Sequence, residues 1–272
     1  MPKTWRPGFR PTHALAAAVL VATLSACDAE TAPGQQQPPA TGYVQQQLAG
    51  HTVTLPKGFT VSVYADGLTD VRLMTLGPEG DVYATLTGGG RVVRLKDTNG
   101  DGVVDSVITV ASGLNSPHAI AFRGDTLYVA ETNEVVRFDR PGGAPTVVVP
   151  NLPSNGGHFT RTLLFQQGQM LVSVGSSCNL CSENDQRRAA VMRYNLDGTG
   201  ATQFATGLRN SVGLAINPVT NEVWASNNDR DNLGDDLPPD RVNILRQHHF
   251  DFSLDSPPGG PTRFTILVPL SR

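Results

Sequence analysis

The chain has 272 residues and a formal net charge of −3, with 21 Lys and Arg against 24 Asp and Glu. This balance leaves no general basic field for the phosphates of a nucleic acid, which argues against a polynucleotide-binding protein. Gly (28) and Pro (20) are frequent and charged residues make up only 17%, a composition that favours many short strands joined by tight turns over long helices.

The N-terminus has the features of an export signal. Basic residues precede an apolar stretch over residues 14–24, which is short for a membrane span. The sequence LSAC at residues 24–27 resembles the bacterial lipobox, in which the Cys becomes the lipidated first residue of the mature chain. We therefore expect residues 1–26 to be a lipoprotein-type signal peptide and Cys27 to attach the chain to a membrane, in the periplasm or at the cell surface. The alternative is an ordinary cleaved signal with a coincidental Cys27.

Residues 27–50 are rich in Gln, Pro and Ala and contain almost no large apolar side chains. Such a segment cannot bury enough surface to order itself, so we predict a lipid-anchored, disordered tether.

Cys178 and Cys181 form a CxxC pair. Outside the cytoplasm such a pair is more often a disulfide than half of a metal site. A zinc site needs further Cys or His ligands, and covalent haem needs His where Ser182 stands. We predict a disulfide, with a metal half-site as the alternative.

From residue 51 onward the chain repeats one plan. Two strand-like runs flank a turn of Gly, Asp or Asn in residues 71–86, 118–131, 161–175 and 212–226. A third strand and a fourth edge strand follow the first three of these pairs. Four strands per unit are typical of a β-propeller blade. The sequence therefore predicts an all-β fold, with about four blades of a β-propeller in residues 51–249.

The ends of this region do not complete a ring. Residues 59–65 (FTVSVYA) resemble an outer strand of a last blade, and residues 250–272 show no repeat. We interpret residues 250–272 as an aberrant tail of a truncated or frame-shifted chain. The alternative is a four-bladed propeller with an unusual tail.

The segment DTNGDGVVD has oxygen-bearing side chains at the spacing of a calcium loop, with Gly102 at the sharp turn. The residues at its positions 1, 3, 5 and 9 are Asp97, Asn99, Asp101 and Asp105. Ile108 at position 12 and the flanking strands exclude an EF-hand pair. We predict a structural Ca²⁺ ion here, against the alternative of a polar turn between strands.

A second acidic segment follows the last predicted strand pair. Its carboxylates repel one another unless a metal ion or the local arginines balance them. They are Asp229, Asp231, Asp235, Asp236 and Asp240, and the arginines are Arg230 and Arg241. A solvated acidic loop is the alternative to a metal site.

Two further segments carry candidate reactive groups. His158 lies in a loop between strand regions, where a histidine can accept a proton near neutral pH, although surface and core histidines are more common. Arg209 and Asn210 open the last unit, and a guanidinium there can clamp a carboxylate or form a salt bridge between blades.

Four of these segments together resemble one family. LPKGFTVSVYADGL, GGHFTRTLLF, VSVGSSCNLCSEND and GLRNSVGLAINP, the last followed by NLGDDLPPD, are similar to the PQQ-dependent sorbosone dehydrogenase family, part of the soluble quinoprotein glucose/sorbosone dehydrogenases. The resemblance runs from about Leu55 to Leu245. It implies a six-bladed propeller that binds pyrroloquinoline quinone (PQQ) with Ca²⁺, oxidises sugars or sugar aldehydes and passes the electrons to an acceptor.

The resemblance also implies roles for individual residues. His158 stands at the place of the general base that takes the substrate hydroxyl proton. Arg209 and Asn210 match the pair that contacts PQQ, and Arg161 is assigned to the cofactor with them. The backbone at Asn228, Asp229 and Arg230 matches the loop whose carbonyl groups hold the cofactor calcium.

The sequence departs from the family pattern after these motifs. Asp229 stands where Gly is expected, and Arg241-Val242 replaces an acidic-apolar pair. The sequence changes character from about Phe250, so the last blades and their basic cofactor-binding residues are expected to be missing.

The leading hypothesis is therefore a lipid-anchored PQQ- and calcium-dependent sugar or sugar-aldehyde dehydrogenase, with an inactive truncated form as one outcome. The alternative is a non-catalytic, calcium-stabilised extracytoplasmic propeller that binds a polymer or protein. A lactonase-like propeller is a third hypothesis.

Overall fold

The computed structural model describes residues 42–234, 238–246, 252–255 and 263–266. The signal peptide, Cys27 and most of the predicted tether lie outside the described residues. Within these residues all the regular secondary-structure elements are β-strands. No helix there could therefore span a membrane. The chain divides into a small N-terminal unit and a larger unit that contains the remaining sheets.

Most residues of a β-hairpin belong to the N-terminal unit. Strands β1 (Tyr43–Leu48) and β2 (His51–Pro56) pair in a two-stranded sheet, and both residues of the connecting turn, Ala49 and Gly50, have positive φ, as a two-residue hairpin turn requires. This corrects two expectations. The C-terminal part of the predicted tether is a strand, and residues 59–65, predicted as a strand, contain none.

The larger unit contains three complete four-stranded sheets and a fourth sheet of three strands. We call them blades 1 to 4. Blade 1 comprises β3 (Val71–Leu76), β4 (Val82–Leu86), β5 (Arg91–Lys96) and β6 (Ser106–Ala111), and blade 2 comprises β7 (Ala119–Arg123), β8 (Thr126–Ala130), β9 (Val135–Phe138) and β10 (Thr146–Val149). Blade 3 comprises β11 (Arg161–Gln166), β12 (Gln169–Val174), β13 (Ala190–Tyr194) and β14 (Thr202–Thr206), and blade 4 comprises β15 (Leu214–Ile216), β16 (Val223–Asn227) and β17 (Arg241–Leu245).

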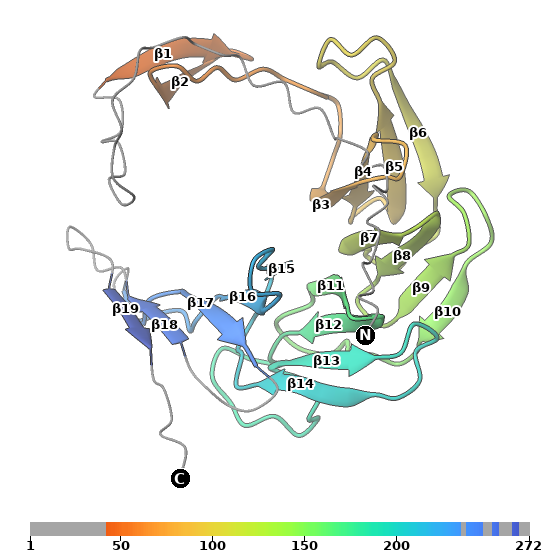
Figure 1. Ribbon diagram of the computed structural model, residues 1–272, viewed down its shortest axis with the longest axis vertical. Helices are drawn as coiled ribbons and strands as arrows, with labels where there is room; N and C mark the ends of the chain where they lie inside the picture. The colour runs from red at the N-terminus through yellow and green to blue at the C-terminus, as the bar shows by residue number, and fades with distance from the viewer. Residues whose placement is uncertain (1–41, 235–237, 247–251, 256–262, 267–272) are drawn as a thin grey trace, which may run out of the picture. The chain divides into compact units, whose positions relative to one another are not determined.

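Each blade is an antiparallel meander in which neighbouring strands are consecutive in sequence. The first strands β3, β7, β11 and β15 lie beside one another, each contacting the next (Figure 1). This arrangement confirms the predicted all-β propeller of four-stranded blades. A further antiparallel pair, β18 (Phe252–Asp255) and β19 (Arg263–Ile266), lies within the segment that was expected to be an aberrant tail.

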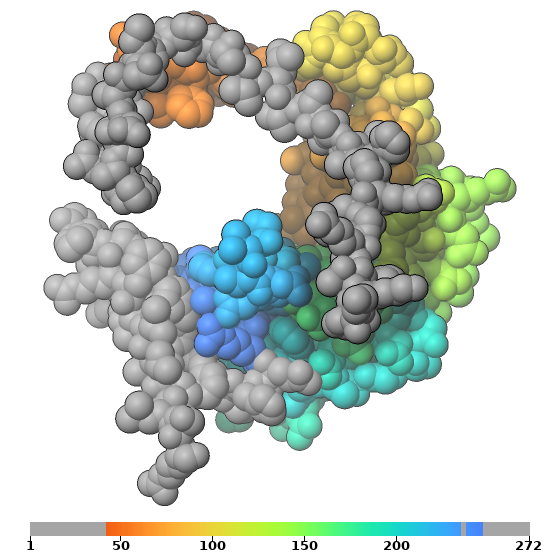
Figure 2. Space-filling view, viewed as in Figure 1, coloured from red at the N-terminus to blue at the C-terminus, as the bar shows by residue number. Residues whose placement is uncertain are grey.

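The blades pack face to face because their middle strands are apolar on both faces. In β8, Leu127 and Val129 pack in the core shared with blade 1, whereas Tyr128 and Ala130 pack in the core shared with blade 3. Successive side chains of a strand point to opposite faces, so a continuous apolar run supplies two cores. Figure 2 shows the resulting close contact of blades 1 to 3, coloured from yellow-brown to cyan.

The first strands also line a cavity of about 460 Å³. Its lining comes from β3, β7, β11 and residues 212–214, and none of the lining side chains is ionisable. Acid–base chemistry therefore has to be sought in the loops at the strand ends.

Polar groups join blades 1 and 2 inside the protein. The Thr85 hydroxyl, on β4, donates a hydrogen bond to the His118 carbonyl at 2.7 Å and accepts one from the Leu73 amide at 3.0 Å. The His118 side chain is 0% exposed, and its Nε2 lies 3.2 Å from the Thr132 hydroxyl. Burial, and then the charges of Arg72 and Arg161, lower the pKa of His118 to about 4.

One glycine fixes the approach of blade 3 to blade 2. Gly198, in the turn after β13, has a φ of +83°, and a Cβ there would collide with the Val148 carbonyl of β10. We expect Gly198→Ala to lower the free energy of unfolding by about 2–4 kcal/mol. Gly168→Ala is the control, because φ is +79° there and nothing lies within 4 Å, so the loss should be about 1 kcal/mol. Equal losses in urea unfolding would contradict the contact with Val148.

The buried His118 makes stability depend on pH. Its pKa is about 4 in the folded protein against an ordinary 6.5, so the unfolded chain binds the proton more readily. The stability that the neutral ring supports is present above pH 6.5 and is lost as the pH falls towards 4, by up to about 3 kcal/mol. In His118→Gln the difference between the unfolding free energies at pH 7 and pH 4.5 should shrink accordingly. If this difference were the same in His118→Gln and in the wild type, protonation of the buried His118 would not be what destabilises the folded protein at low pH.

Candidate functional site

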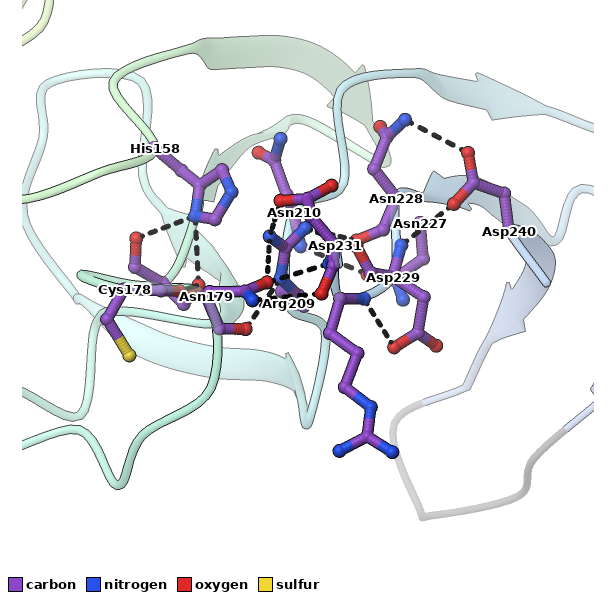
Figure 3. A network of polar contacts seen from close by, with 12 residues as sticks. His158, Cys178, Asn179, Arg209, Asn210, Asn227, Asn228, Asp229, Asp231 and Asp240 are labelled. Carbon is purple, nitrogen blue, oxygen red and sulfur yellow. Dashed lines mark hydrogen bonds and ion pairs between the residues drawn. The ribbon is translucent and has the colours of Figure 1, made fainter. Parts of the chain in front are cut away.

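Loops from blades 3 and 4 meet at one end of their strands. His158 precedes β11, Ser176 follows β12, Arg209 precedes β15 and Asn228 follows β16. Backbone hydrogen bonds join these loops, from Ser176 N to Arg209 O (2.7 Å), from Asn228 N to Asn210 O (3.0 Å) and from His158 N to Ser176 O (3.2 Å). The structure thus brings together His158, Arg209, Asn210 and the segment 228–230, which are far apart in sequence (Figure 3).

The hydrogen bonds of His158 determine which ring nitrogen carries the proton. Nδ1 lies 2.9 Å from the Ser176 hydroxyl oxygen and 3.0 Å from the Ser176 carbonyl oxygen. The hydroxyl donates its own hydrogen to the Cys178 carbonyl at 2.7 Å, so both Ser176 oxygens act as acceptors and Nδ1 is the donor. Nε2 of the neutral ring therefore has the lone pair, and it has no hydrogen-bond partner among the described residues. This half-buried histidine presents a proton acceptor.

Gly175 allows His158 and Asn210 to lie side by side. A Cβ at Gly175 would be 2.5 Å from the Cβ of His158 and 2.8 Å from Oδ1 of Asn210. Both contacts are too short for any residue with a side chain. The Asn210 carboxamide thus lies next to the His158 ring, and both side chains are half-buried (Figure 3).

Arg209 uses all five of its N–H groups on the protein. Nε and Nη2 donate to the Asn179 carbonyl and side-chain oxygens at 2.8 Å each, and Nη2 also donates to the Asp231 carboxylate at 2.7 Å. Nη1 donates to the carbonyls of Asn228, at 3.2 Å, and Asp229. Arg209 therefore ties three loop segments together, and in this arrangement none of its N–H groups is available for the predicted contact with PQQ.

The same contacts bear on the predicted calcium ligands at 228–230. The carbonyls of Asn228 and Asp229 already face the Arg209 cation, and the Asp229 carboxylate lies 3.9 Å from Arg241. A calcium ion on these carbonyls would be close to a guanidinium of like charge. The described arrangement therefore does not fit Ca²⁺ at this segment.

Arginines lie beside two of the described carboxylates of the acidic loop. Asp231 pairs with Arg209 at 2.7 Å, and Asp240 accepts hydrogen bonds from the Asp229 amide at 2.9 Å and the Asn228 side chain at 3.2 Å. Asp235 and Asp236 lie outside the described residues. Of the carboxylates that the structure describes here, Asp231 and Asp229 face arginines, whereas Asp240 has only amide donors.

Arg161 lies inside the protein and does not face the site surface. It is 0% exposed, and its guanidinium donates to the carbonyls of Thr160 (3.0 Å), His158 (3.2 Å) and Pro153. Burial, and then the nearby charge of Arg188, lower the pKa of Arg161 to about 10. The predicted cofactor contact is replaced by another role, because Arg161 fixes the loop that carries His158.

Several residues of the site were missed by sequence reasoning. Arg188 is buried and donates to the Gly175 carbonyl at 3.3 Å and the Asn155 side chain at 3.1 Å. Ser176 and Asn179 lie within the VGSSCNLC segment that carries the family resemblance. Their position in this segment was the one feature of the sequence that could have identified them as site residues. Arg188 stands in no recognisable pattern.

The two cysteines of this segment are joined. Cys178 and Cys181 form a disulfide with an S–S distance of 2.00 Å and a Cα–Cα distance of 6.1 Å. The ring that they close contains Asn179 and Leu180.

The predicted calcium loop connects β5 and β6 on blade 1. Its side chains accept backbone hydrogen bonds: Asp97 from Gly100 (2.7 Å) and Gly102 (2.9 Å), Asn99 from Asp101 (2.9 Å), Asp101 from Val103 (2.8 Å) and Asp105 from Thr98 (2.7 Å). The hydrogen bonds from Thr98 lower the pKa of Asp105. Within the described part of the chain, no three His, Cys, Asp or Glu side chains are grouped closely enough to hold a metal ion. A Ca²⁺ ion here would also need Asn99 and backbone carbonyls.

Solved structures share the fold. The PQQ domain of pyranose dehydrogenase from Coprinopsis cinerea, in its holo form, superposes with a TM-score of 0.63 at 22% identity, covering 79% of this chain and 57% of that one. A calcium structure of a Trichoderma reesei enzyme of carbohydrate-active enzyme family AA12 gives a TM-score of 0.60 at 23% identity, covering 77% and 56%. At these identities the likeness concerns the propeller fold alone.

Curated proteins are similar in sequence as well. A pyrroloquinoline quinone-dependent sugar dehydrogenase from Hypocrea jecorina is 29% identical over 203 residues, which are 65% of this chain and 47% of that protein. An uncharacterised protein from Borreliella burgdorferi is 25% identical over 221 residues, 74% of this chain and 56% of that protein. The chain thus spans about half the length of these relatives.

The match that settles the family covers most of the propeller. The TrAA12-like family model matches residues 53–248, more than half of the 272. The expected resemblance to PQQ quinoprotein dehydrogenases is confirmed at this level, and the sorbosone subtype stays a prediction. The chain belongs to the TrAA12-like family.

Proposed function

We propose that the chain is a PQQ-dependent oxidoreductase that removes hydride from a sugar or sugar aldehyde and passes the electrons to a separate acceptor. The observation that carries the proposal is the proton-accepting Nε2 of His158, fixed by Ser176 beside the Asn210 carboxamide. The sugar dehydrogenase activity named for the relative from Hypocrea jecorina supports it. A sorbosone-type substrate is the finer part of the proposal.

His158 is suited to the proton transfer in this reaction. As the carbon atom that bears the substrate hydroxyl gives up hydride, the hydroxyl proton moves to Nε2, and the ring becomes an imidazolium. The Nδ1–H group then donates a stronger, charge-assisted hydrogen bond to the two Ser176 oxygens, which stabilises the charged ring. PQQ, when bound, supplies the two-electron acceptor for the hydride.

The remaining residues of the site bind and orient. Nδ2 of Asn210 has no partner among the described residues and is able to donate to a quinone or carboxylate oxygen. The exposed Arg230 side chain is able to pair with a carboxylate of PQQ, because its guanidinium has no hydrogen-bond partner in the described part of the chain. Asn210 and Arg230 therefore fit an anionic, oxygen-rich cofactor, whereas Arg161 and Arg209 support the loops.

The N-terminal sequence supports a proposal about where the protein acts. We infer export and attachment to a bacterial membrane through a lipid on Cys27, in agreement with the lipobox-like LSAC sequence. The sugar and the electron acceptor would then be encountered outside the cytoplasm.

Reconstitution with PQQ and Ca²⁺ tests the function. We expect sugar-dependent reduction of an artificial dye, and His158→Ala should reduce kcat by about 10²–10⁴-fold because proton transfer loses its base. PQQ binding, followed by absorbance, should persist in this variant. His51→Ala is the control, since His51 is exposed in the hairpin. If the wild-type chain binds PQQ but oxidises no aldose or aldehyde, the non-catalytic binding propeller becomes the better account.

Calcium binding at residues 97–105 has its own test. In the absence of PQQ, Ca²⁺ at 100 times its Kd should raise the unfolding free energy by about 2.7 kcal/mol. Asp101→Ala should remove this gain, because it deletes an oxygen at a ligand position. Asp139→Ala is the control, since this exposed carboxylate lies in another loop and pairs with Arg137. Thermal unfolding of each variant with Ca²⁺ and with a chelator measures the stabilisation by Ca²⁺. Equal stabilisation of Asp101→Ala and Asp139→Ala would contradict a calcium site at 97–105.

A further inference from the structure

The Cys178–Cys181 disulfide closes a small ring beside the site, and Asn179 lies within that ring. Asn179 is exposed, but both its backbone and its side chain bond to other loops. Its carbonyl accepts from Nε of Arg209, and its side-chain oxygen accepts from Nη2 of the same guanidinium, each at 2.8 Å. One residue thus holds two nitrogen atoms of Arg209.

Asn179 also holds the loop after β16. Its side-chain oxygen accepts from the Asp231 amide at 2.8 Å, and its Nδ2 donates to the Asp231 carbonyl at 3.1 Å. These two bonds join residues 52 positions apart in sequence. Asp231 in turn pairs with Arg209 at 2.7 Å, so Asn179, Arg209 and Asp231 form a closed set of contacts (Figure 3).

The disulfide-closed segment 178–181 is also linked to His158, through the Cys178 carbonyl and Ser176. The Ser176 hydroxyl donates to the Cys178 carbonyl at 2.7 Å, and this bond leaves the hydroxyl oxygen as an acceptor for Nδ1 of His158. The Cys178 carbonyl and Asn179, both within the disulfide ring, are therefore in contact with the site. A covalent cross-link that limits the conformations of residues 178–181 also limits those of its hydrogen-bonding groups.

We propose that Asn179, held by the Cys178–Cys181 disulfide, is the positioning residue that orders Arg209 and the loop 228–231 around His158. The use of this ordered arrangement in PQQ binding and catalysis rests on the proposed function. The ordering of Arg209 and the loop 228–231 by Asn179 does not. Without such a fixed partner, an exposed loop would lose more conformational entropy on adopting the same geometry. Opening the disulfide takes two electrons and two protons, which a small dithiol supplies as it becomes a cyclic disulfide, and is expected to release both ends of the network.

Hydrogen exchange at the Asp231 amide tests the proposal directly, because this amide donates to Asn179. In Asn179→Ala, exchange of the peptide containing residues 228–231 should become about tenfold faster or more, with the melting temperature nearly unchanged. Leu180→Ala is the matched control, since Leu180 lies in the same ring with a 72% exposed side chain, and should exchange like the wild type. Asn179→Asp keeps the acceptor oxygen and should exchange more slowly than Asn179→Ala.

Opening the ring supplies the second arm. The double variant Cys178→Ser, Cys181→Ser, and the wild type treated with a dithiol, should both show faster exchange in residues 228–231 and in the peptide around Arg209. With PQQ as the probe, the concentration needed for half-saturation should rise in Asn179→Ala and stay unchanged in Leu180→Ala. Wild-type exchange rates in Asn179→Ala would overturn the proposal. Faster exchange in a chain that oxidises no sugar would leave the positioning role in place and remove the proposed function.

Discussion

The structure depends on the burial of both faces of blades 2 and 3 between neighbouring blades. The strand residues 127–130 show why, since alternate side chains enter the cores shared with blade 1 and with blade 3. A sheet that is apolar on both faces is stable only between two neighbours. The first strands β3, β7, β11 and β15 are thereby brought side by side, and so are the loops at their ends. The candidate site is a consequence of this packing, because its residues come from loops of different blades.

Backbone contacts then make these loops one structure. Gly175 allows His158 and Asn210 to approach, and the Ser176 amide bonds to the Arg209 carbonyl. Buried Arg161 and Arg188 bond to carbonyls of the loop before β11 and of Gly175. Each of these bonds satisfies a buried polar group that would otherwise be costly. The position and tautomer of His158 thus depend on the protein groups packed around it.

The strands were predictable from the sequence, and the partners of the site residues were not. Turn residues between apolar runs located the strand pairs of all four blades, because a strand pair is a local feature. The hairpin at 43–56 was missed, since Gln-rich strands resemble a disordered tether in composition. His158 was proposed as a site residue from the sequence because a loop histidine is conspicuous. Ser176 was not, because its bond to a residue 18 positions away depends on how β11 and β12 pair.

The two acidic segments differ in whether basic side chains lie beside their carboxylates. At 228–231, Arg209 and Arg241 face the carboxylates of Asp231 and Asp229, so the segment already contains its cations. At 97–105, backbone N–H groups contact Asp97, Asp101 and Asp105, and none of these three forms an ion pair with a described basic residue. Backbone N–H groups are dipoles without net charge, so they leave the negative charge of these carboxylates unneutralised, although no three such side chains in the described part of the chain are grouped closely enough to hold a metal ion by themselves. A divalent cation therefore stays a prediction at 97–105, where Asn99 and backbone carbonyls would have to complete the ligand set, and is disfavoured at 228–231, where Arg209 faces the carbonyls.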